Sequence, residues 1–445
     1  MGNEVRAMNI IKTCGILGIF ASSALAEPET ARLERQIEEL RLRVAELSAQ
    51  QTRLSDKELR RTIDQVLDDA DRRSHWLAAE GFTAGWDNGF WLKSADGNYA
   101  MKLGLLFQPR FVMDYREGGG SGLSADSDTQ AGFEIKRTQF IVSGNAFTPD
   151  LTYNFMWESP QGGGLGLLDA FVSYKFADDF AMKFGQYFDP LSRETLNGPP
   201  RRLGVEASLV DFYLAGGLAD RVQGMSLIYG LYKKDNPLYV EVMVHDGAKS
   251  RNTNFEDDPS SGNFGFAARV EAKCFGDWSS YKDLTAAGNK NDLLAFGAGV
   301  DFTEADNRQQ WLASVDGQWE SGALALFAAV NLRYVEQRNE PQDDSFFDYG
   351  GLVQAAYLVN EHFEVFGRYG FIEFDEPVAG TDSAIHEVVA GVNWYVQPST
   401  PHRAKVTFDL TYLPNGGGPG AKGLGIAGGD DDDEIVLRGQ FQLFL

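Results

Sequence analysis

The chain has 445 residues and an acidic balance, with 40 Lys and Arg against 64 Asp and Glu and a formal net charge of −24. This balance excludes a nucleic-acid partner bound through its phosphates, because that mode of binding needs a surplus of basic side chains. Apolar residues make up 43% of the sequence, yet no run reaches the roughly 18 residues of a spanning helix. If the chain crosses a membrane, it therefore crosses with strands.

Residues 1–26 are predicted to be a secretory signal peptide. Arg6 and Lys12 supply positive charge around the start of a short apolar core, and Ala24 and Ala26 form a small-x-small cleavage site. A signal of this kind directs the chain out of the cytoplasm, so the mature protein is expected in the cell envelope.

Residues 27–77 predict a periplasmic helical segment that contains a coiled coil. Its apolar residues recur in alternating steps of four and three, which is a heptad pattern. These residues are Leu33, Ile37, Leu40, Val44, Leu47 and Leu54, with Gln51 at the remaining seam position. A single amphipathic helix lying on its own domain is the alternative, but the narrow seam favours pairing between helices.

Beyond residue 80 the apolar period changes to two, as in strands. In 101–115, for example, Leu103 and Phe107 share one face while Lys102 and Arg110 share the other. Sixteen such segments predict an all-β barrel of about 16 antiparallel strands over residues 81–445, with the apolar face toward lipid. The predicted strands are 101–115, 132–147, 150–158, 168–176, 180–187, 221–230, 237–246, 263–274, 293–302, 309–319, 322–335, 348–358, 362–374, 385–396, 402–412 and 434–445.

Long and short connections alternate between these strands, as expected for short periplasmic turns and long extracellular loops. Two connections break the rule. Residues 275–292 are long where a turn is expected, and 303–308 are short where a loop is expected, so a missed strand in this region is an open alternative. The longest connection, 188–220, is the third long loop.

Several short stretches carry a family resemblance, of which Pro190-Leu191-Ser192-Arg193-Glu194 after Gly185-Gln186 is the most specific. With Gly89–Gly97, Gln108-Pro109-Arg110 and Leu168–Val172, they make residues 81–445 similar to the phosphate-selective porin O and P family. The resemblance implies a trimer of 16-stranded outer-membrane barrels, each narrowed by a third loop folded into the pore.

The resemblance also implies that basic side chains near the constriction attract anions, since a ring of Arg or Lys raises the local anion concentration. The candidate pore residues are Arg193, Arg201 and Arg202 of the third loop, Arg221 at its end, and Lys183, Arg110, Arg137, Arg333 and Arg368, which strand parity points inward. The predicted inner wall is mixed, because parity also points acidic residues inward. Pairing with a neighbouring carboxylate is the simpler interpretation of any single position.

The expected function is passive diffusion of small hydrophilic solutes, either without preference or with a preference for anions such as phosphate. The expected partners are outer-membrane lipid, the solutes and two further copies of the chain in a homotrimer. A structural tether that contacts peptidoglycan through the N-terminal helix is the alternative, and deleting 27–77 separates the two. We predict no enzyme activity and no cofactor. The five histidines are scattered, and the acidic run at 430–434 is interpreted as solvated loop rather than a calcium site.

Overall fold

The computed structural model describes only part of the chain. The described residues are 35, 37–46, 64, 81–86, 89–116, 128–159, 163–254, 264–287, 292–305, 308–339, 342–375, 384–418, 420–427 and 433–445. The chain divides into two units, 1–80 and 81–445. In the first unit residues 37–46 are helical, within the predicted coiled coil, whereas the predicted signal peptide lies outside the described residues. Among the described residues, no helix is both long enough and apolar enough to span a bilayer.

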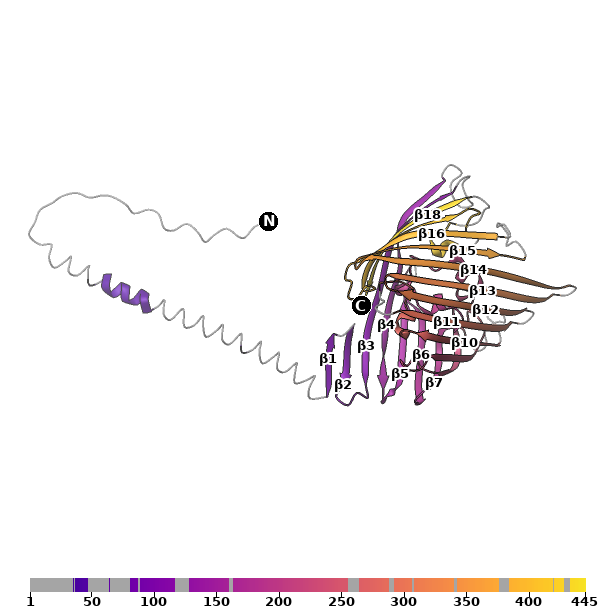
Figure 1. Ribbon diagram of the computed structural model, residues 1–445. Helices are drawn as coiled ribbons and strands as arrows, with labels where there is room; N and C mark the ends of the chain where they lie inside the picture. The colour runs from indigo at the N-terminus through magenta and orange to yellow at the C-terminus, as the bar shows by residue number, and fades with distance from the viewer. Residues whose placement is uncertain are drawn as a thin grey trace, which may run out of the picture. The chain divides into compact units, whose positions relative to one another are not determined.

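The second unit is a closed antiparallel barrel (Figure 1). In the described part of the chain, sixteen strands pair in sequence order from β3 to β18, and β18 pairs back onto β3. The strands are β3 (Ala100–Arg116), β4 (Thr129–Ala146), β5 (Thr148–Glu158), β6 (Gly166–Ala177), β7 (Phe180–Phe188), β8 (Arg221–Tyr229), β9 (Leu238–His245), β10 (Phe264–Phe275), β11 (Leu293–Ala305), β12 (Arg308–Ser321), β13 (Leu324–Asn339), β14 (Gln342–Asn360), β15 (Phe363–Glu373), β16 (Ala384–Tyr395), β17 (Ala404–Leu413) and β18 (Glu434–Phe444). Each predicted segment corresponds to one of these strands.

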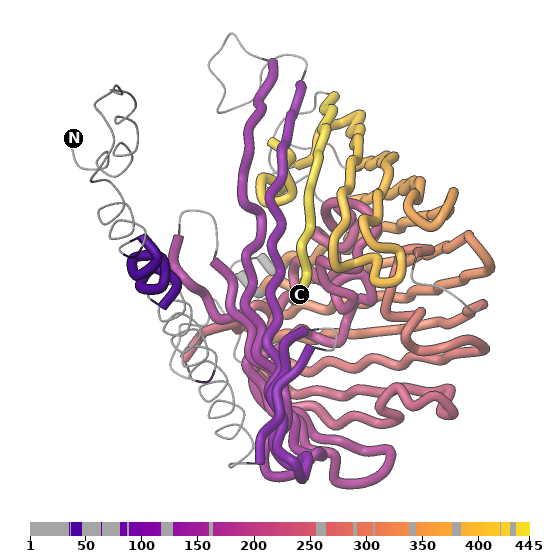
Figure 2. Tube along the Cα trace, turned by 90° about the vertical axis from the view of Figure 1, so that its left-hand side faces the viewer, coloured from indigo at the N-terminus to yellow at the C-terminus, as the bar shows by residue number. Residues whose placement is uncertain are grey.

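A hairpin that the sequence analysis did not predict precedes the barrel. Its strands are β1 (Phe82–Trp86) and β2 (Phe90–Ser94), and β2 pairs with the first residues of β3, from Ala100 to Leu103. Strand β18 pairs with β3 only from Leu106 onward, so the hairpin covers an edge that β18 leaves open. Both views show the hairpin beside the start of β3 (Figures 1 and 2).

The two faces of the barrel differ as the strand period predicts. Large apolar side chains such as Phe184, Val315 and Phe408 are exposed on the outer face, while charged side chains such as Arg269 and Arg438 are buried inside. A protein in water would have this pattern reversed, because exposing so many large apolar side chains is unfavourable. The outer face is therefore suited to lipid.

The third loop begins at residue 189, just after β7, and folds into the barrel. It contains α2 (Arg193–Leu196), the 3₁₀ turn η1 (Pro199–Arg201), α3 (Leu209–Leu214) and α4 (Gly216–Ala219). Helix α3 buries Leu209, Val210 and Leu214 in a cluster with inward apolar residues of β13 to β15. Glycines of the wall let it approach closely, since a Cβ at Gly350 would lie 2.9 Å from Leu214.

This apolar patch departs from the expectation of a polar inner wall. Phe327, Leu352 and Ile372 point inward but contact the loop instead of water. Residues 420–427 of the last loop fold inward as well, through η3 (Ala421–Leu424), and join the same cluster. Part of the inner face of the barrel is thus an apolar surface against which the loops pack.

The region with irregular connections holds no missed strand among its described residues. Strand β10 pairs directly with β11, as far as Phe275 opposite Leu294. The long connection between them contains α5 (Trp278–Tyr281), and its described residues 276–287 lie mostly buried. The described part of this connection is therefore a folded segment and contains no additional strand.

Candidate functional site at the barrel constriction

The third loop is held to the far wall of the barrel by side chains that bond its backbone. Its residues 202–206 carry most of these bonds. They are Lys405 Nζ to the carbonyl of Arg202 (2.9 Å), Asn393 Nδ2 to the carbonyl of Leu203 (3.0 Å), the amide of Val205 to Asp409 Oδ2 (2.8 Å) and Arg368 to the carbonyl of Glu206 (3.1 Å). Since backbone bonds fix position regardless of side chain, this stretch is set firmly against β15 to β17.

The family-like stretch at the start of the loop builds a buried polar network. Ser192 and Thr195 donate hydrogen bonds to the carboxylate of Asp211, and Glu194 accepts bonds from the amide and hydroxyl of Ser208. Burial, followed by the nearby charge of Glu194, raises the pKa of Asp211 to about 6. The stretch therefore stabilises the folded loop, and this structural role accounts for its family-like sequence.

Two of the four candidate arginines in the third loop and at its end form buried ion pairs. Arg193 is only 3% exposed and lies 3.0 Å from Glu271 of β10. Arg221 pairs with Asp169 of β6, at the opposite end of the loop. Neither guanidinium faces open solvent, so these two predicted pore residues hold the loop to the wall.

Three of the predicted wall residues also form ion pairs with carboxylates of the barrel wall. Lys183 lies 2.7 Å from Glu241, Arg333 lies 3.2 Å from Asp348, and Arg368 lies 2.9 Å from Glu387. The pairing of inward basic residues with neighbouring carboxylates is the arrangement that the simpler interpretation predicts. It reduces the charge that any of them offers to a passing solute.

Positive charge is in excess beside β3 and β4, where four cations surround one carboxylate. Glu206 of the third loop lies 2.6 Å from Arg110, 2.7 Å from Arg137, 3.5 Å from Lys136 and 3.8 Å from Arg202. Burial disfavours its ionisation, but the charges of Arg137, Lys136, Arg110 and Arg202 outweigh burial and hold the pKa of its carboxyl well below the usual range. Arg110 also pairs with Glu134, and four cations against these two carboxylates still leave the cluster with a positive excess.

Lys136 belongs to this cluster although strict alternation places it on the outer face. The register of β3 and β4 shifts between Gln108 and Pro109, so that Gln108 faces Arg137 while Pro109 faces Ile135. The extra residue of this bulge is Lys136, which brings two consecutive basic residues to the inner face. Pro109 was the signal in the sequence, since proline inside a strand often marks a bulge.

The opposite wall carries a buried acidic cluster at the root of the loop. His245 Nε2 lies 2.9 Å from Asp301 and 3.7 Å from Asp189, and all three residues are buried. The amide of Gly247 donates to His245 Nδ1, which places the ring proton on Nε2, toward the carboxylates. An imidazole that binds a metal through Nε2 carries its proton on Nδ1, which is the reverse arrangement.

The pKa of Asp189 in this cluster is raised well above its usual range by burial and then by the charge of Asp301. No sequence pattern pointed to this cluster, because its members are brought together only by the barrel.

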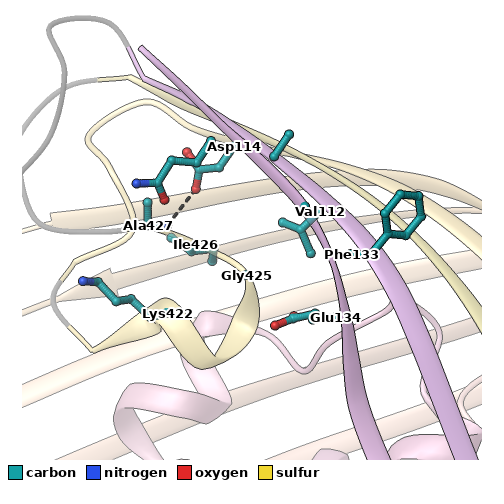
Figure 3. Close-up of a pocket in the computed structure, with 11 residues that line it drawn as sticks. Val112, Asp114, Phe133, Glu134, Lys422, Gly425, Ile426 and Ala427 are labelled. Atoms are coloured by element: carbon teal, nitrogen blue, oxygen red, sulfur yellow. Dashed lines mark hydrogen bonds between the residues drawn. The ribbon is translucent and has the colours of Figure 1, made fainter. Parts of the chain in front are cut away.

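Two pockets lie along β3 and β4, on either side of the Glu206 cluster. The pocket toward the long loops has a volume of about 570 Å³. Figure 3 shows Ala427 of the last loop beside Asp114 of β3, and a hydrogen bond of 2.7 Å joins the amide of Ala427 to the carboxylate of Asp114. Phe133 points away from this pocket.

The pocket toward the short turns has a volume of about 530 Å³ and is lined by basic residues. Lys102 of β3, Arg201 of the third loop, and His402 and Arg403 of the turn after β16 all line it. Arg201 is the one loop arginine among the four candidates that is exposed, while Arg202 next to it is half-buried. Sequence reasoning identified Arg201 and named Glu206 among the third-loop carboxylates that oppose the arginines, but it missed Arg403, which lies in a turn where no period predicts orientation.

Comparison with known proteins places these observations in a family. Residues 110–416 match the model of the family described as phosphate-selective porin O and P. An uncharacterized protein of Aquifex aeolicus (strain VF5) is 24% identical over an alignment of 269 residues, and the match covers 55% of this chain and 62% of that protein. The chain thus spans less than two thirds of the length of that relative.

Solved structures share the fold at low sequence identity. An anion-selective porin from Comamonas acidovorans is 12% identical, with a TM-score of 0.55 over 78% of this chain and 100% of that chain. The outer membrane channel DcaP of Acinetobacter baumannii is 13% identical, with a TM-score of 0.51 over 81% of this chain and 100% of that chain. The family match covers more than half of the chain and includes all nine predicted pore residues. This chain belongs to the phosphate-selective porin O and P family.

Proposed function

We propose that this protein is an outer-membrane porin that lets small hydrophilic solutes diffuse passively and that prefers anions. The family and the lipid-suited outer face of the barrel support the channel. The observation that carries the anion preference is the cation excess beside β3 and β4, where Arg110, Lys136, Arg137 and Arg202 share one buried carboxylate. Fixed positive charge near a passage attracts anions and repels cations.

The pocket toward the short turns, which we call the periplasmic pocket, extends this region of positive charge to the periplasmic end of the barrel. Lys102, Arg201 and Arg403 line a space that solvent reaches. The opposite wall carries the buried carboxylates Asp189 and Asp301, so we assign the anion preference to the side formed by β3 and β4. The anion-selective character in the name of the Comamonas acidovorans porin supports the same preference by analogy of fold.

The anion preference is tested by removing charge from the periplasmic pocket. In planar bilayers under a potassium chloride gradient, the double variant Lys102→Gln and Arg201→Gln should shift the reversal potential toward that of a less anion-selective pore. The matched control is Lys93→Gln with Lys233→Gln, which removes two positive charges outside this pocket. An unchanged anion-to-cation permeability in the first double variant would show that the pocket is not the filter.

The proposal includes a homotrimer whose N-terminal helices pair in the periplasm. Support comes from the apolar seam, since Ile37, Leu40 and Val44 are 50%, 60% and 61% exposed in the single chain. Exposed apolar side chains at heptad spacing favour helix pairing. Deleting residues 27–77 should leave conductance intact, whereas loss of envelope integrity with normal conductance would favour the tether.

A further inference from the structure

The connection between β10 and β11 is not explained by a simple diffusion channel. Porin barrels join strands at the periplasmic end by short turns, yet here residues 276–292 separate the two strands. We call the described residues 276–287 the inner turn. Within it Trp278, Tyr281, Leu284 and Ala286 are at most 4% exposed, so the segment lies inside the barrel instead of hanging from its rim.

The inner turn is fastened where it leaves β10. Gly276 has a φ of +92°, and a Cβ there would lie 2.4 Å from the carbonyl of Asp292, so only glycine permits this inward departure. Trp278 Nε1 donates to the carbonyl of Asn236 at 2.8 Å. Tyr281 then donates to Asp316 of β12 at 2.9 Å.

From there the inner turn follows the inner wall across several strands. Gln318 of β12 donates to the carbonyl of Asp283 at 2.6 Å. The amide of Ala286 donates to Glu364 of β15 at 2.6 Å, and Asp283 bonds His402 in the turn between β16 and β17. The segment thus follows the inner wall from β10 to the turn before β17.

The inner turn also braces the third loop. The amide of Leu284 donates to the carbonyl of Arg201 at 3.4 Å, and the guanidinium of Arg201 reaches the carbonyl of Lys282 at 3.5 Å. Ala286 packs in one apolar cluster with Leu203. Arg201 is the exposed arginine of the periplasmic pocket, so the position of that charge depends on the inner turn as well as on its own loop.

We propose that the inner turn is the second half of the constriction. Together with the third loop it sets the width of the passage on the periplasmic side, and by bonding Arg201 it fixes a selectivity-determining charge. This inference rests on the proposed channel function. It assigns size exclusion to two segments that are far apart in sequence, where the family resemblance implies a single inward loop.

The direct test replaces residues 277–291 of the full-length chain with the turn Asn-Gly. The close approach of Gly276 to Asp292 shows that such a link can join the two strands. We expect single-channel conductance to rise by about twofold or more, because the inner turn no longer occupies part of the barrel interior. Liposome-swelling assays should show entry of larger neutral sugars, and the reversal potential should indicate weaker anion preference as Arg201 loses its brace. Conductance and exclusion equal to wild type would overturn the inference.

A second variant keeps the test decisive if the shortened barrel does not fold. Asp283→Asn with Glu364→Gln replaces a carboxylate of the inner turn and the β15 carboxylate that the inner turn bonds, without changing the length of the segment. We expect larger and more variable conductance, while the control Asp150→Asn, an exposed carboxylate paired with Lys175, should behave as wild type. Unchanged conductance in the double variant overturns the inference. Absence of any conductance in the wild-type protein would instead refute the proposed channel.

Discussion

Most inward charges of this barrel hold the structure together. Arg193 and Arg221 secure the two ends of the third loop through Glu271 and Asp169. Arg201 differs from them because its side chain is exposed in a pocket. A basic residue in a pore sequence therefore has to be judged by its partners before it is assigned to selectivity.

Glu206 is the residue whose loss should destabilise the constriction most clearly. Replacing it by Gln leaves four cations without their shared carboxylate, and removing one partner of a buried ion pair costs about 3–5 kcal/mol. We expect a loss of this size in the free energy of unfolding, measured by urea titration of the protein in lipid vesicles. The exposed Glu361→Gln is the control, and a loss below about 1 kcal/mol for Glu206→Gln would contradict the role given to the cluster.

The same residue predicts a dependence on pH. The pKa of Glu206 is lowered from its usual 4.5 in the folded protein, so the unfolded chain binds this proton more tightly. Its stabilising contribution is therefore complete above pH 4.5 and is lost as the pH falls through the folded pKa. Wild type should lose stability on acidification below pH 4.5 more steeply than Glu206→Gln. If the free energy of unfolding falls equally with pH in wild type and Glu206→Gln, the stabilising role of the ion cluster is contradicted.

Parity alone predicted the inward position of all five wall candidates, from Arg110 to Arg368. It failed at Lys136, because the bulge beside Pro109 shifts the alternation by one residue. It could not predict the ion partners of Glu206 or His245, because these partners lie on other elements. Periodicity predicts which face a side chain takes, whereas ion clusters depend on which strands and loops meet.

Among the elements, the third loop is a folded unit seated on an apolar patch of the wall. Helix α3 has only six residues and would not form alone in water, so its stability comes from packing. Leu214 is fully buried against the wall and is the point of closest approach to Gly350. The loop therefore depends on this contact.

Leu214→Ala should loosen the third loop while leaving the barrel intact. Truncating a buried leucine costs about 2–5 kcal/mol, through lost burial and the cavity left behind. We expect faster hydrogen–deuterium exchange of amides in 209–214, with strand amides protected as in wild type. Leu196→Ala, a half-buried leucine in α2, serves as the comparison. Equal protection of the 209–214 amides from exchange in both variants would show that packing against the apolar patch of the wall does not order the loop.

Element prediction succeeded where the period was long and regular, and each of the sixteen predicted barrel strands is present. The hairpin of β1 and β2 was missed because five-residue strands carry too few alternations to stand out. The unusual length of 275–292 was visible in the sequence, but length alone did not distinguish a strand from a segment folded inward. Tertiary contacts of Tyr281 and Leu284 decide that outcome.

At the scale of the whole molecule, a closed ring of strands turns one apolar face toward lipid. Val330 lies near the middle of β13 and is 51% exposed on the outer face. Val330→Arg should cost about 2–4 kcal/mol in unfolding free energy measured in lipid vesicles, because a charge near the bilayer midplane is poorly solvated. Val330→Leu should be nearly neutral. A tolerated arginine would mean that this face does not meet lipid.

The central claim is that the barrel conducts, and that anions pass preferentially along the basic side formed by β3 and β4. Single-channel recording of the purified full-length protein in a planar bilayer, under a potassium chloride gradient, tests it most directly. We predict discrete conductance steps with a reversal potential displaced toward the chloride equilibrium potential. A bilayer that stays silent, or a reversal potential displaced toward potassium, would contradict the account.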